Sequence, residues 1–561
     1  MTKWYENLAR MHNIPLIMID VPYANTKEPD QNKIDYMVDT KSILDIFLNV
    51  SYLNSKKDKN ISIKTLNAWL NYKGSIFDSE NAITTLYETT KDSKLKEQID
   101  TLRMKQRYYA KLQQSASKEK NYKEKIKTTT EEIEELTQDI ASKAQSFREA
   151  EGLKDINYQD ISSTLADKQL YIDYAKAGEN YYIFTLDKKE NITFTQIDSN
   201  DTKEIDRLVE LFRADIQTML KGLGKLTPQK LQALNQNSKE TLGKLHTLLI
   251  TKPLSEIIKE KNNLLISPDG ALRLLPFEAL YDSTTQKYLL EESDIEYIPS
   301  GKERVRLIRY NSTTNDTNCN SKLVLFTDPH YDDTTKAKLA QWQKRSTEEN
   351  QSIYNNELES ALYGLPLFDR LRGTRKEARF ISELFGAEHI ISYRARKSSE
   401  ENLLKTKHPK ILHLSTHGFF LNNPKILNPM LKSGLVFAGA NIARTKYDNT
   451  DGLVTALKLS GLELKATDLV VLSACQTGVV DSNSTESVSG LSKAFIQAGA
   501  KSVLSTLWSV ANKESTTLIE DFYKQIADKE SYSVALKRAK LKMITQGKHP
   551  FFWGGFVLVG E

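Results

Sequence analysis

Two segments of the sequence each end in a side chain that can take part in nucleophilic chemistry. The first begins at Ile411 and ends in His417 and Gly418, and the second begins at Leu469 and ends in Cys475. In both, an apolar run stops at the reactive residue and a glycine follows within three positions. A cysteine attacks as its thiolate, and a histidine within hydrogen-bond reach can remove the thiol proton. The pattern predicts a cysteine nucleophile, Cys475, with His417 as its base, and makes the chain a candidate cysteine peptidase.

The glycine after the histidine has a use in this chemistry. We expect the backbone N–H groups of Gly418 and Cys475 to face the oxyanion that forms during attack, where loss of one such donor costs about 2.7–4 kcal/mol. The alternative is structural: a buried cysteine at a strand end and a hydrogen-bonded core histidine. Alternation along the strand would place His413 on the same face as Ser415 and His417, inside the sheet packing. His413 is better explained there as a structural histidine than as a catalytic one.

The histidine and the cysteine can meet only if their two strands are neighbours, so the elements around them matter. In open α/β sheets the working groups gather at the carboxyl ends of the strands. Beyond residue 320 the sequence alternates between apolar runs and helical patterns, which predicts a parallel-rich sheet with helices on both faces. Thr374 is a plausible N-cap with Glu377 at capping-box spacing. The predicted strands are 323–327, 389–392, 411–415, 469–473, 502–507 and 556–559, the last closing the sheet, and the predicted helices are 374–385, 487–498, 513–527 and 533–545.

The middle of the chain has strand patterns of its own but no reactive pair. Residues 169–174 and 181–186 read as strands joined through Gly178, residues 192–197 as a third, and a helix is expected over about 202–220. Another strand, beginning at 264, ends in the turn Ser-Pro-Asp-Gly. Residues 311–320 are a polar linker by composition, and Cys319 within it is most simply an inert exposed thiol.

Residues 91–150 differ in composition from the rest. Charges of both signs are dense, and apolar residues recur at helical spacing, which predicts a long amphipathic helix or a helical pair. Packing against neighbouring helices is the simpler role, and a partner-binding or signal-transmitting arm is the alternative. The apolar positions are Ile133, Leu136, Ile140, Ala144 and Phe147.

Composition limits the class of protein. The 561 residues carry 39% hydrophobic and 27% charged residues and a net charge of +5, with no dense basic tract, so no nucleic acid is predicted as a partner. No apolar run is long enough for a membrane helix, and the first residues lack the apolar core of a secretory signal. Two cysteines argue against a disulfide framework and favour a reducing cytoplasm. We expect no cofactor and no metal, because no His/Cys/Asp set has zinc spacing.

A longer series of motifs resembles a known family. Over the C-terminal 400 or so residues the sequence is similar to the CHAT domain, a caspase-like family related to separases. The resemblance implies a caspase-hemoglobinase-like sheet flanked by helices, with His417 as base and Cys475 as nucleophile. The matching landmarks include Ser267–Gly270, Leu275–Leu280, Tyr297–Ser300, Arg372–Thr374, Glu377–Ala378, His413–Phe420, Ser433–Leu435, Leu472–Gly478, Gly490–Leu491, Ala498–Ala500, Leu507–Trp508 and Trp553.

The same resemblance implies a domain organisation. Residues 311–561 would form the active caspase-like half, and residues 156–310 a degenerate caspase-like half packed on it. Residues 1–155 would be a helical region, either regulatory or following a tetratricopeptide repeat (TPR) array as in TPR-CHAT proteins, because the segment around Lys73 is similar to the one that follows such arrays. No 34-residue repeat is evident in residues 1–150 themselves.

The substrate pocket is the least defined part. A loop beginning at Trp508 would border the nucleophile, with packing of Trp508 in the core as the alternative. Many relatives carry an acidic residue four positions after this tryptophan, where the present chain has Asn512. Glu514, Asp451 and Glu486 are then the candidate acids for a pocket that accepts Arg or Lys before the cut, as in separases.

The expected function is that of an intracellular cysteine endopeptidase that cleaves specific protein partners. By resemblance to the family, an activating sensor protein or complex would switch it on in bacterial antiviral defence or programmed cell death. A non-catalytic caspase-like scaffold or protein-interaction module is the alternative from another class. Other thiol chemistry, such as acyl transfer, is also compatible with the sequence.

Overall fold

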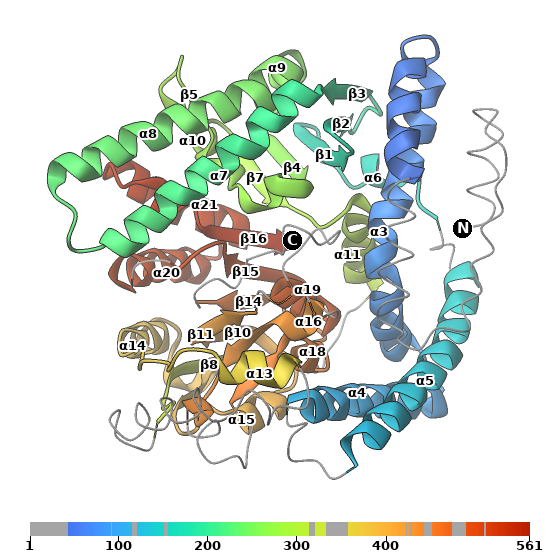
Figure 1. Ribbon diagram of the computed structural model, residues 1–561, viewed down its shortest axis with the longest axis vertical. Helices are drawn as coiled ribbons and strands as arrows, with labels where there is room; N and C mark the ends of the chain where they lie inside the picture. The colour runs from blue at the N-terminus through green and yellow to red at the C-terminus, as the bar shows by residue number, and fades with distance from the viewer. Residues whose placement is uncertain are drawn as a thin grey trace.

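One large sheet organises the molecule. The computed structural model describes residues 43–90, 92–114, 121–150, 155–313, 320–332, 357–421, 423, 425–426, 429–441, 452–473, 490–509 and 512–560. Eleven strands form the sheet in the order β3-β2-β1-β4-β7-β16-β15-β14-β10-β8-β9, with helices on both faces (Figure 1). The predicted class, an α/β sheet flanked by helices with a helical N-terminal region, is confirmed.

The strands fall into two runs along the sheet. Strands β9, β8, β10, β14 and β15 are mutually parallel, and so are β1, β4 and β7. The antiparallel pairing of β16 with β15 reverses the direction between the two runs. The bounds are β1 (Gln169–Ala177), β2 (Asn180–Asp187), β3 (Ile192–Ile197), β4 (Asn263–Ser267), β7 (Asp294–Tyr297), β8 (Asn320–Pro329), β9 (Ile390–Ala395), β10 (Pro409–Ser415), β14 (Leu469–Leu472), β15 (Ser502–Thr506) and β16 (Phe556–Gly560).

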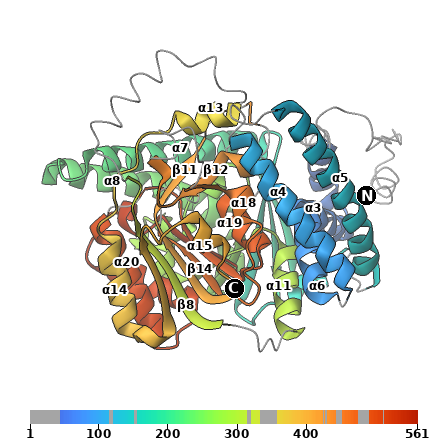
Figure 2. The same ribbon diagram turned by 90° about the horizontal axis from the view of Figure 1, so that it is seen from below.

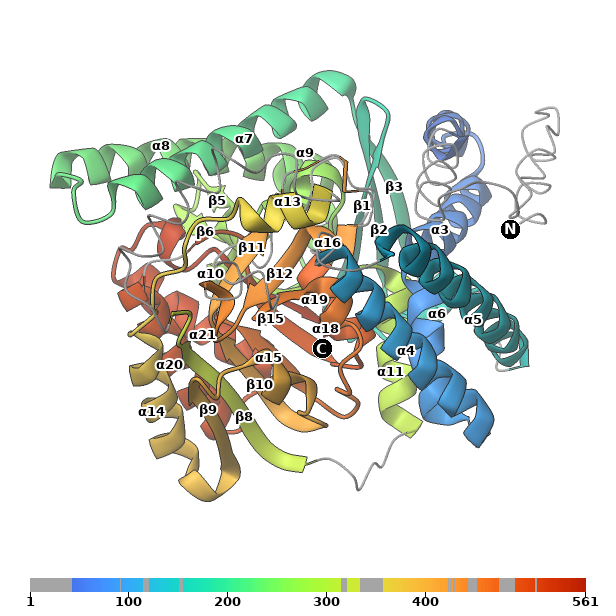
Figure 3. The same cartoon turned by 60° about the horizontal axis from the view of Figure 1, so that its bottom comes forward.

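Alternation along each strand sends neighbouring side chains to opposite faces. On β10, Ile411 joins the core beneath one helical layer, whereas Leu412 and Leu414 join the core beneath the other. The first layer contains α7 (Ser199–Gly222), α8 (Pro228–His246), α14 (Thr374–Phe385), α20 (Asn512–Ala527) and α21 (Tyr532–Thr545). The second contains α3 (Lys59–Thr89), α6 (Tyr158–Ser162), α11 (Gly301–Thr313), α13 (Glu357–Tyr363), α15 (Glu400–Leu404), α16 (Pro429–Lys432), α18 (Ala456–Leu459) and α19 (Gly490–Gln497) (Figure 3).

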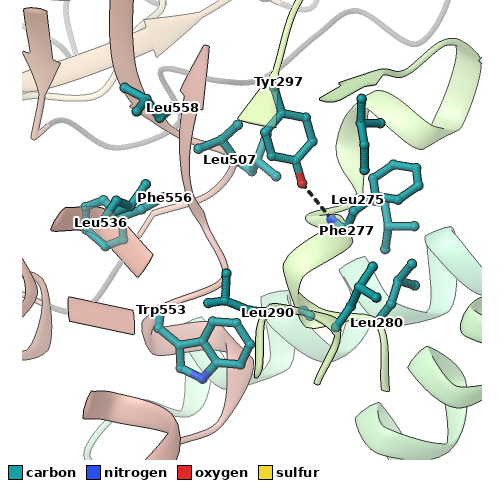
Figure 4. Packing of buried hydrophobic residues seen from close by; sticks show 14 of the residues in the cluster. Leu275, Phe277, Leu280, Leu290, Tyr297, Leu507, Leu536, Trp553, Phe556 and Leu558 are labelled. Atoms are coloured by element: carbon teal, nitrogen blue, oxygen red, sulfur yellow. Dashed lines mark hydrogen bonds between the residues drawn. The ribbon is translucent and has the colours of Figure 1, made fainter. Parts of the chain in front are cut away.

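Strand β16 does not close the sheet as predicted. It lies inside the sheet, between β15 and β7. An apolar strand of this kind can be buried on both faces, and the sequence does not reveal which neighbours it will have. The junction to β7 is backed by a core that includes Tyr297, whose hydroxyl accepts a hydrogen bond from the Phe277 N–H at 2.8 Å (Figure 4).

Helix α3 is part of the core and not an appendage. Its Trp69 indole N–H and its Lys73 ammonium both donate to the Asp173 carboxylate of β1, at 2.9 and 2.7 Å. Lys73 also donates to the carbonyls of Tyr174 and Ser267, so all three of its protons have acceptors. The lysine that aligned this segment with the family therefore anchors α3 to two strands.

The charged region at 91–150 forms a helical pair, as predicted. Helices α4 (Ser93–Gln114) and α5 (Tyr122–Ala150) pack on each other and on the end of α3. Ile133, Leu136 and Ile140 contact the apolar side chains of α4, which confirms the packing role. The side chains of Ala144 and Phe147 lie outside the described residues. Figure 2 shows the pair running alongside the sheet domain.

Smaller features can be compared with the structure one at a time. The hairpin of β1 and β2 turns at Gly178 with φ +55°, as expected. Most of the predicted linker, including Cys319, lies outside the described residues, between α11 and β8. Among the described residues, no helix is long and apolar enough to cross a bilayer, and no cluster of three metal-ligating side chains is found.

Candidate active site

The strands that lead to the two reactive residues are neighbours. Strand β10 pairs in parallel with β14, with Ile411 opposite Leu469 and Leu414 opposite Leu472. The ladder continues one residue further, because the Ser473 N–H donates to the Leu414 carbonyl at 3.0 Å. Cys475 follows two positions later and, with Gly478, lies outside the described residues.

His417 itself stands at the edge of a second, smaller sheet. After Ser415 the chain leaves the large sheet and enters β11 (His417–Phe420), which pairs with β12 (Ser433–Val436), itself paired with β13 (Leu453–Thr455). His417 is therefore not in the alternation of β10, where the sequence had placed it with His413 and Ser415. Gly418 lies next to it on β11, opposite Leu435.

The imidazole of His417 is fixed by one hydrogen bond and two aromatic rings. Its Nε2 lies 2.7 Å from the Asp369 carbonyl oxygen. The ring stacks at a tilt against Phe368 and Tyr331, with centroids 5.5 and 5.3 Å away. Because a carbonyl can only accept, Nε2 carries the proton, and in the neutral ring Nδ1 keeps the lone pair. That nitrogen is the one available to act as a base.

The electrostatics favour a neutral imidazole. Burial lowers the pKa of His417 below its ordinary value, and the Asp369 carbonyl and carboxylate only partly offset this. Desolvation acts in this direction because it penalises the charged form. His417 is therefore ready to accept a proton at neutral pH.

His413 is a structural histidine, as expected. It is fully buried, with Nδ1 3.0 Å from the Tyr523 hydroxyl. Its Nε2 approaches Glu377 Oε1 to 3.3 Å, although the geometry does not suit a hydrogen bond. The other Glu377 oxygen accepts from the Ser415 hydroxyl at 3.0 Å. This buried cluster ties α14 to the end of β10.

The predicted capping box at Thr374 and Glu377 is wrong. Gly373 occupies the N-cap, and Thr374 is the first helical residue. The Thr374 hydroxyl accepts from the Asp328 N–H at 2.8 Å, and Glu377 points into the core. Thr374 and Glu377 have the spacing of a capping box. Their side chains are instead buried against β8 and β10, where they cannot cap the helix.

Of the five substrate-pocket candidates, Trp508 and Glu514 have described side chains. Trp508 is 1% exposed, and its indole donates to the Phe551 carbonyl at 2.9 Å, so it is a core residue and not part of a channel wall. Asn512 begins α20, and Glu514 on the same helix lies 3.8 Å from Lys548. Asp451 and Glu486 lie outside the described residues.

No sequence pattern indicates the residues that hold His417. A backbone carbonyl such as that of Asp369 is present at every position, and Phe368 and Tyr331 lie far from His417 along the chain. Asn441 was also missed, although it is fully buried and bonded to the backbone of Phe368. An unexplained polar residue within an apolar run (Val436–Ala440 precedes it) is the one clue available.

The helical pair reaches the small sheet directly. Gln114, fully buried at the end of α4, donates to the Leu453 carbonyl of β13 at 3.2 Å. Leu453 lies opposite Val436, and Val436 lies opposite His417. A single row of cross-strand neighbours thus links α4 to His417. Arg107, about two turns earlier on the same face of α4, donates to the Gly461 carbonyl just after α18.

Comparison with known proteins gives the family. The model of the CHAT domain matches residues 239–561. Among curated proteins, tetratricopeptide repeat protein 28 of Homo sapiens is 26% identical over 325 residues, and that of Mus musculus 25% over 388 residues. These matches cover 53% and 63% of this chain but only 12% and 14% of the relatives, so the chain spans a small part of their length.

Solved structures show weaker similarity. A Saccharomyces cerevisiae separase–securin complex aligns over 95% of this chain and 43% of that chain, with 10% identity and a TM-score of 0.42. The Arg-specific cysteine proteinase gingipain R aligns over 60% of this chain and 68% of that chain, with 9% identity and a TM-score of 0.33. Since the family model covers more than half of the sequence, including both strands of the candidate site, the chain belongs to the CHAT domain family.

Proposed function

We propose that this protein is a cysteine endopeptidase in which His417 is the base and Cys475 the nucleophile. The observation that carries the proposal is the parallel register of β10 and β14. His417 lies six positions after Ile411, and Cys475 lies six positions after its partner Leu469. Both residues follow closely on the carboxyl ends of these neighbouring parallel strands, the edge where the working groups of open α/β sheets gather.

The environment of His417 suits the chemistry. Nδ1 takes the proton from Cys475 Sγ, the thiolate attacks the scissile carbonyl, and the protonated imidazole then gives its proton to the leaving amine. Water hydrolyses the resulting thioester. The Asp369 carbonyl, on Nε2–H, stabilises the imidazolium while it exists. In this proposal the N–H groups of Gly418 and Cys475 bind the oxyanion.

Regulation through the N-terminal helices is also part of the proposal. The motivating contact is the row from Gln114 through Leu453 and Val436 to His417. A sensor protein or complex that moves α4 would move β13 and, through it, the strand that carries the base. Bacterial antiviral defence or programmed cell death is the setting proposed for such a switch, in the cytoplasm, on the family resemblance alone.

The substrate is proposed to be one or a few partner proteins. Preference for Arg or Lys before the cut remains a hypothesis, for which Glu514, Asp451 and Glu486 are the candidate acids and Asn512 a neighbouring polar residue. Glu514 is the one with a described side chain, and it is partly exposed at the start of α20.

Mapping of new protein N-termini in cells tests the proposal. Cells that express the wild-type chain, with and without the stimulus that activates it, are compared with cells that express Cys475→Ala. New N-termini that require Cys475 support an endopeptidase. The same set of N-termini in both, together with no labelling of Cys475 by thiol-reactive peptide probes, would contradict it and favour the non-catalytic scaffold.

A further inference from the structure

The segment Phe368–Arg370 holds His417 but has no regular structure of its own. It lies between α13 and α14 and forms neither helix nor strand. A backbone carbonyl is a reliable partner only if the chain that carries it is fixed. The contacts on each side of Asp369 show how this is done.

Asn441 fixes the residue before Asp369. Its side-chain Oδ1 accepts from the Phe368 N–H at 3.1 Å, and its Nδ2 donates to the Phe368 carbonyl at 3.0 Å. Both backbone groups of Phe368 are thus bonded to one amide, in the manner of a strand partner. Asn441 is itself held, because its own N–H donates to the Tyr331 carbonyl at 3.1 Å. It therefore ties together the backbones that carry both aromatic neighbours of His417.

Asp328 fixes the residue after Asp369. Arg370 donates from Nε to Asp328 Oδ1 at 2.7 Å and from Nη2 to Oδ2 at 2.9 Å, a bidentate pair with defined geometry. Asp328 is fully buried at the end of β8, with φ +49° and a break in the β8–β9 register beside it. Irregular backbone of this kind occurs next to active sites, where it directs a side chain. Arg375 of α14 also binds this carboxylate.

We propose that Asn441 and Arg370 are positioning residues for the catalytic base. They act through the Asp369 carbonyl, which they hold from both sides, and so keep the His417 ring in place with Nδ1 directed away from the segment. The expected effect of these two residues on the rate of substrate cleavage rests on the proposed function. The structural part of the inference, the fixing of His417, does not depend on that function. A displacement of about 1 Å in a reacting group can reduce a rate about 100-fold.

Two arginines on one carboxylate provide a matched comparison. Arg370→Ala and Arg375→Ala each remove one partner of Asp328 and leave the other, but only Arg370 adjoins Asp369. We expect Arg370→Ala to lower the rate constant for alkylation of Cys475 by iodoacetamide, and kcat on a cleaved substrate, by about 10- to 100-fold. KM should change less than about 3-fold, and Arg375→Ala should stay within about 3-fold of wild type.

An NMR signal tests the inference without any measurement of enzyme activity. Selective ¹⁵N labelling of histidine should reveal the His417 Nε2–H as a slowly exchanging resonance, assigned by its absence in His417→Gln. It should persist in Arg375→Ala and be lost or exchange faster in Arg370→Ala and in Asn441→Ala. Equal behaviour of the two arginine variants, in signal and in rate, would overturn the inference. If wild type and Cys475→Ala cleave nothing but the signal follows this pattern, only the proposed function fails. Because Asn441 is buried and its variant can misfold, Arg370→Ala carries the decision.

Discussion

A buried ion pair between Lys540 and Glu278 is expected to control the stability of the junction at β7. Lys540 of α21 lies 2.7 Å from Glu278, the middle residue of the short 3-10 turn Phe277–Ala279, and the two side chains are 1% and 4% exposed. The Glu278 carboxylate also accepts from the Tyr297 hydroxyl. Lys540→Met leaves that carboxylate buried without its counter-charge, and loss of one partner of a buried pair costs about 3–5 kcal/mol.

The same helix offers a control. Lys537, one turn earlier on α21, lies 2.6 Å from Asp294, but these side chains are 23% and 47% exposed. Because solvent screens such a pair, Lys537→Met is expected to cost about 0–1 kcal/mol. The two substitutions are chemically identical, and the ion-pair distances are nearly equal, so the difference between them measures burial.

Urea unfolding followed by tryptophan fluorescence gives the comparison, with the midpoint of the first unfolding transition in each variant set against that of wild type. The double variant Lys540→Met with Glu278→Gln should recover most of the loss, since the amide still accepts from Tyr297 and no uncompensated charge remains. Equal midpoints for Lys540→Met and Lys537→Met would refute the reasoning. So would a double variant as unstable as the single one.

Three further outcomes are expected. In Cys475→Ala, the NMR titration of His417 should give a pKa below the ordinary value of 6.5, and a higher value would show that burial does not dominate. His549, whose pKa burial lowers to about 4, binds a proton in the unfolded chain at higher pH than in the folded one. Stability should therefore be full above pH 6.5 and fall by about 3 kcal/mol toward pH 4, and His549→Asn should flatten this part of the urea-midpoint profile. Gln114→Ala deprives the Leu453 carbonyl of this buried donor, at a cost of about 1–3 kcal/mol, and should slow alkylation of Cys475. Gln98→Ala, which loses hydrogen bonds to Asp139 and Lys143 of α5, should not.

Periodicity was sufficient for most of the elements. The strand and helix patterns after residue 320 predicted β8, β10, β14 and β15 because buried parallel strands leave continuous apolar runs. The proposed dyad required the strands before His417 and Cys475 to be neighbours, and β10 and β14 meet this condition. The family motifs added the caspase-like type of sheet, which periodicity cannot specify.

The remaining errors have a common cause, because side-chain partners are chosen in three dimensions. Glu377 has the spacing of a cap residue but contacts Ser415 across the core. Trp508 ends a strand at the right place for a channel but fills a space between Phe212 and Gly555. The Asp369 carbonyl has no sequence signal at all. Each depends on which elements pack together, and local spacing does not contain that information.

The place of β16 in the sheet has a mechanical consequence. One register pair, Val559 with Tyr297, joins it to β7, whereas the neighbouring ladders are several residues long. Few backbone hydrogen bonds hold the two strands together there. Apolar packing and the buried Lys540–Glu278 pair therefore provide most of the stability of this junction. As denaturant is added, we expect the pairing of β16 with β7 to be lost first. The two parts of the sheet on either side of this junction should then remain folded, each with its own helices. Unfolding in two steps, and not in one, would be the visible sign.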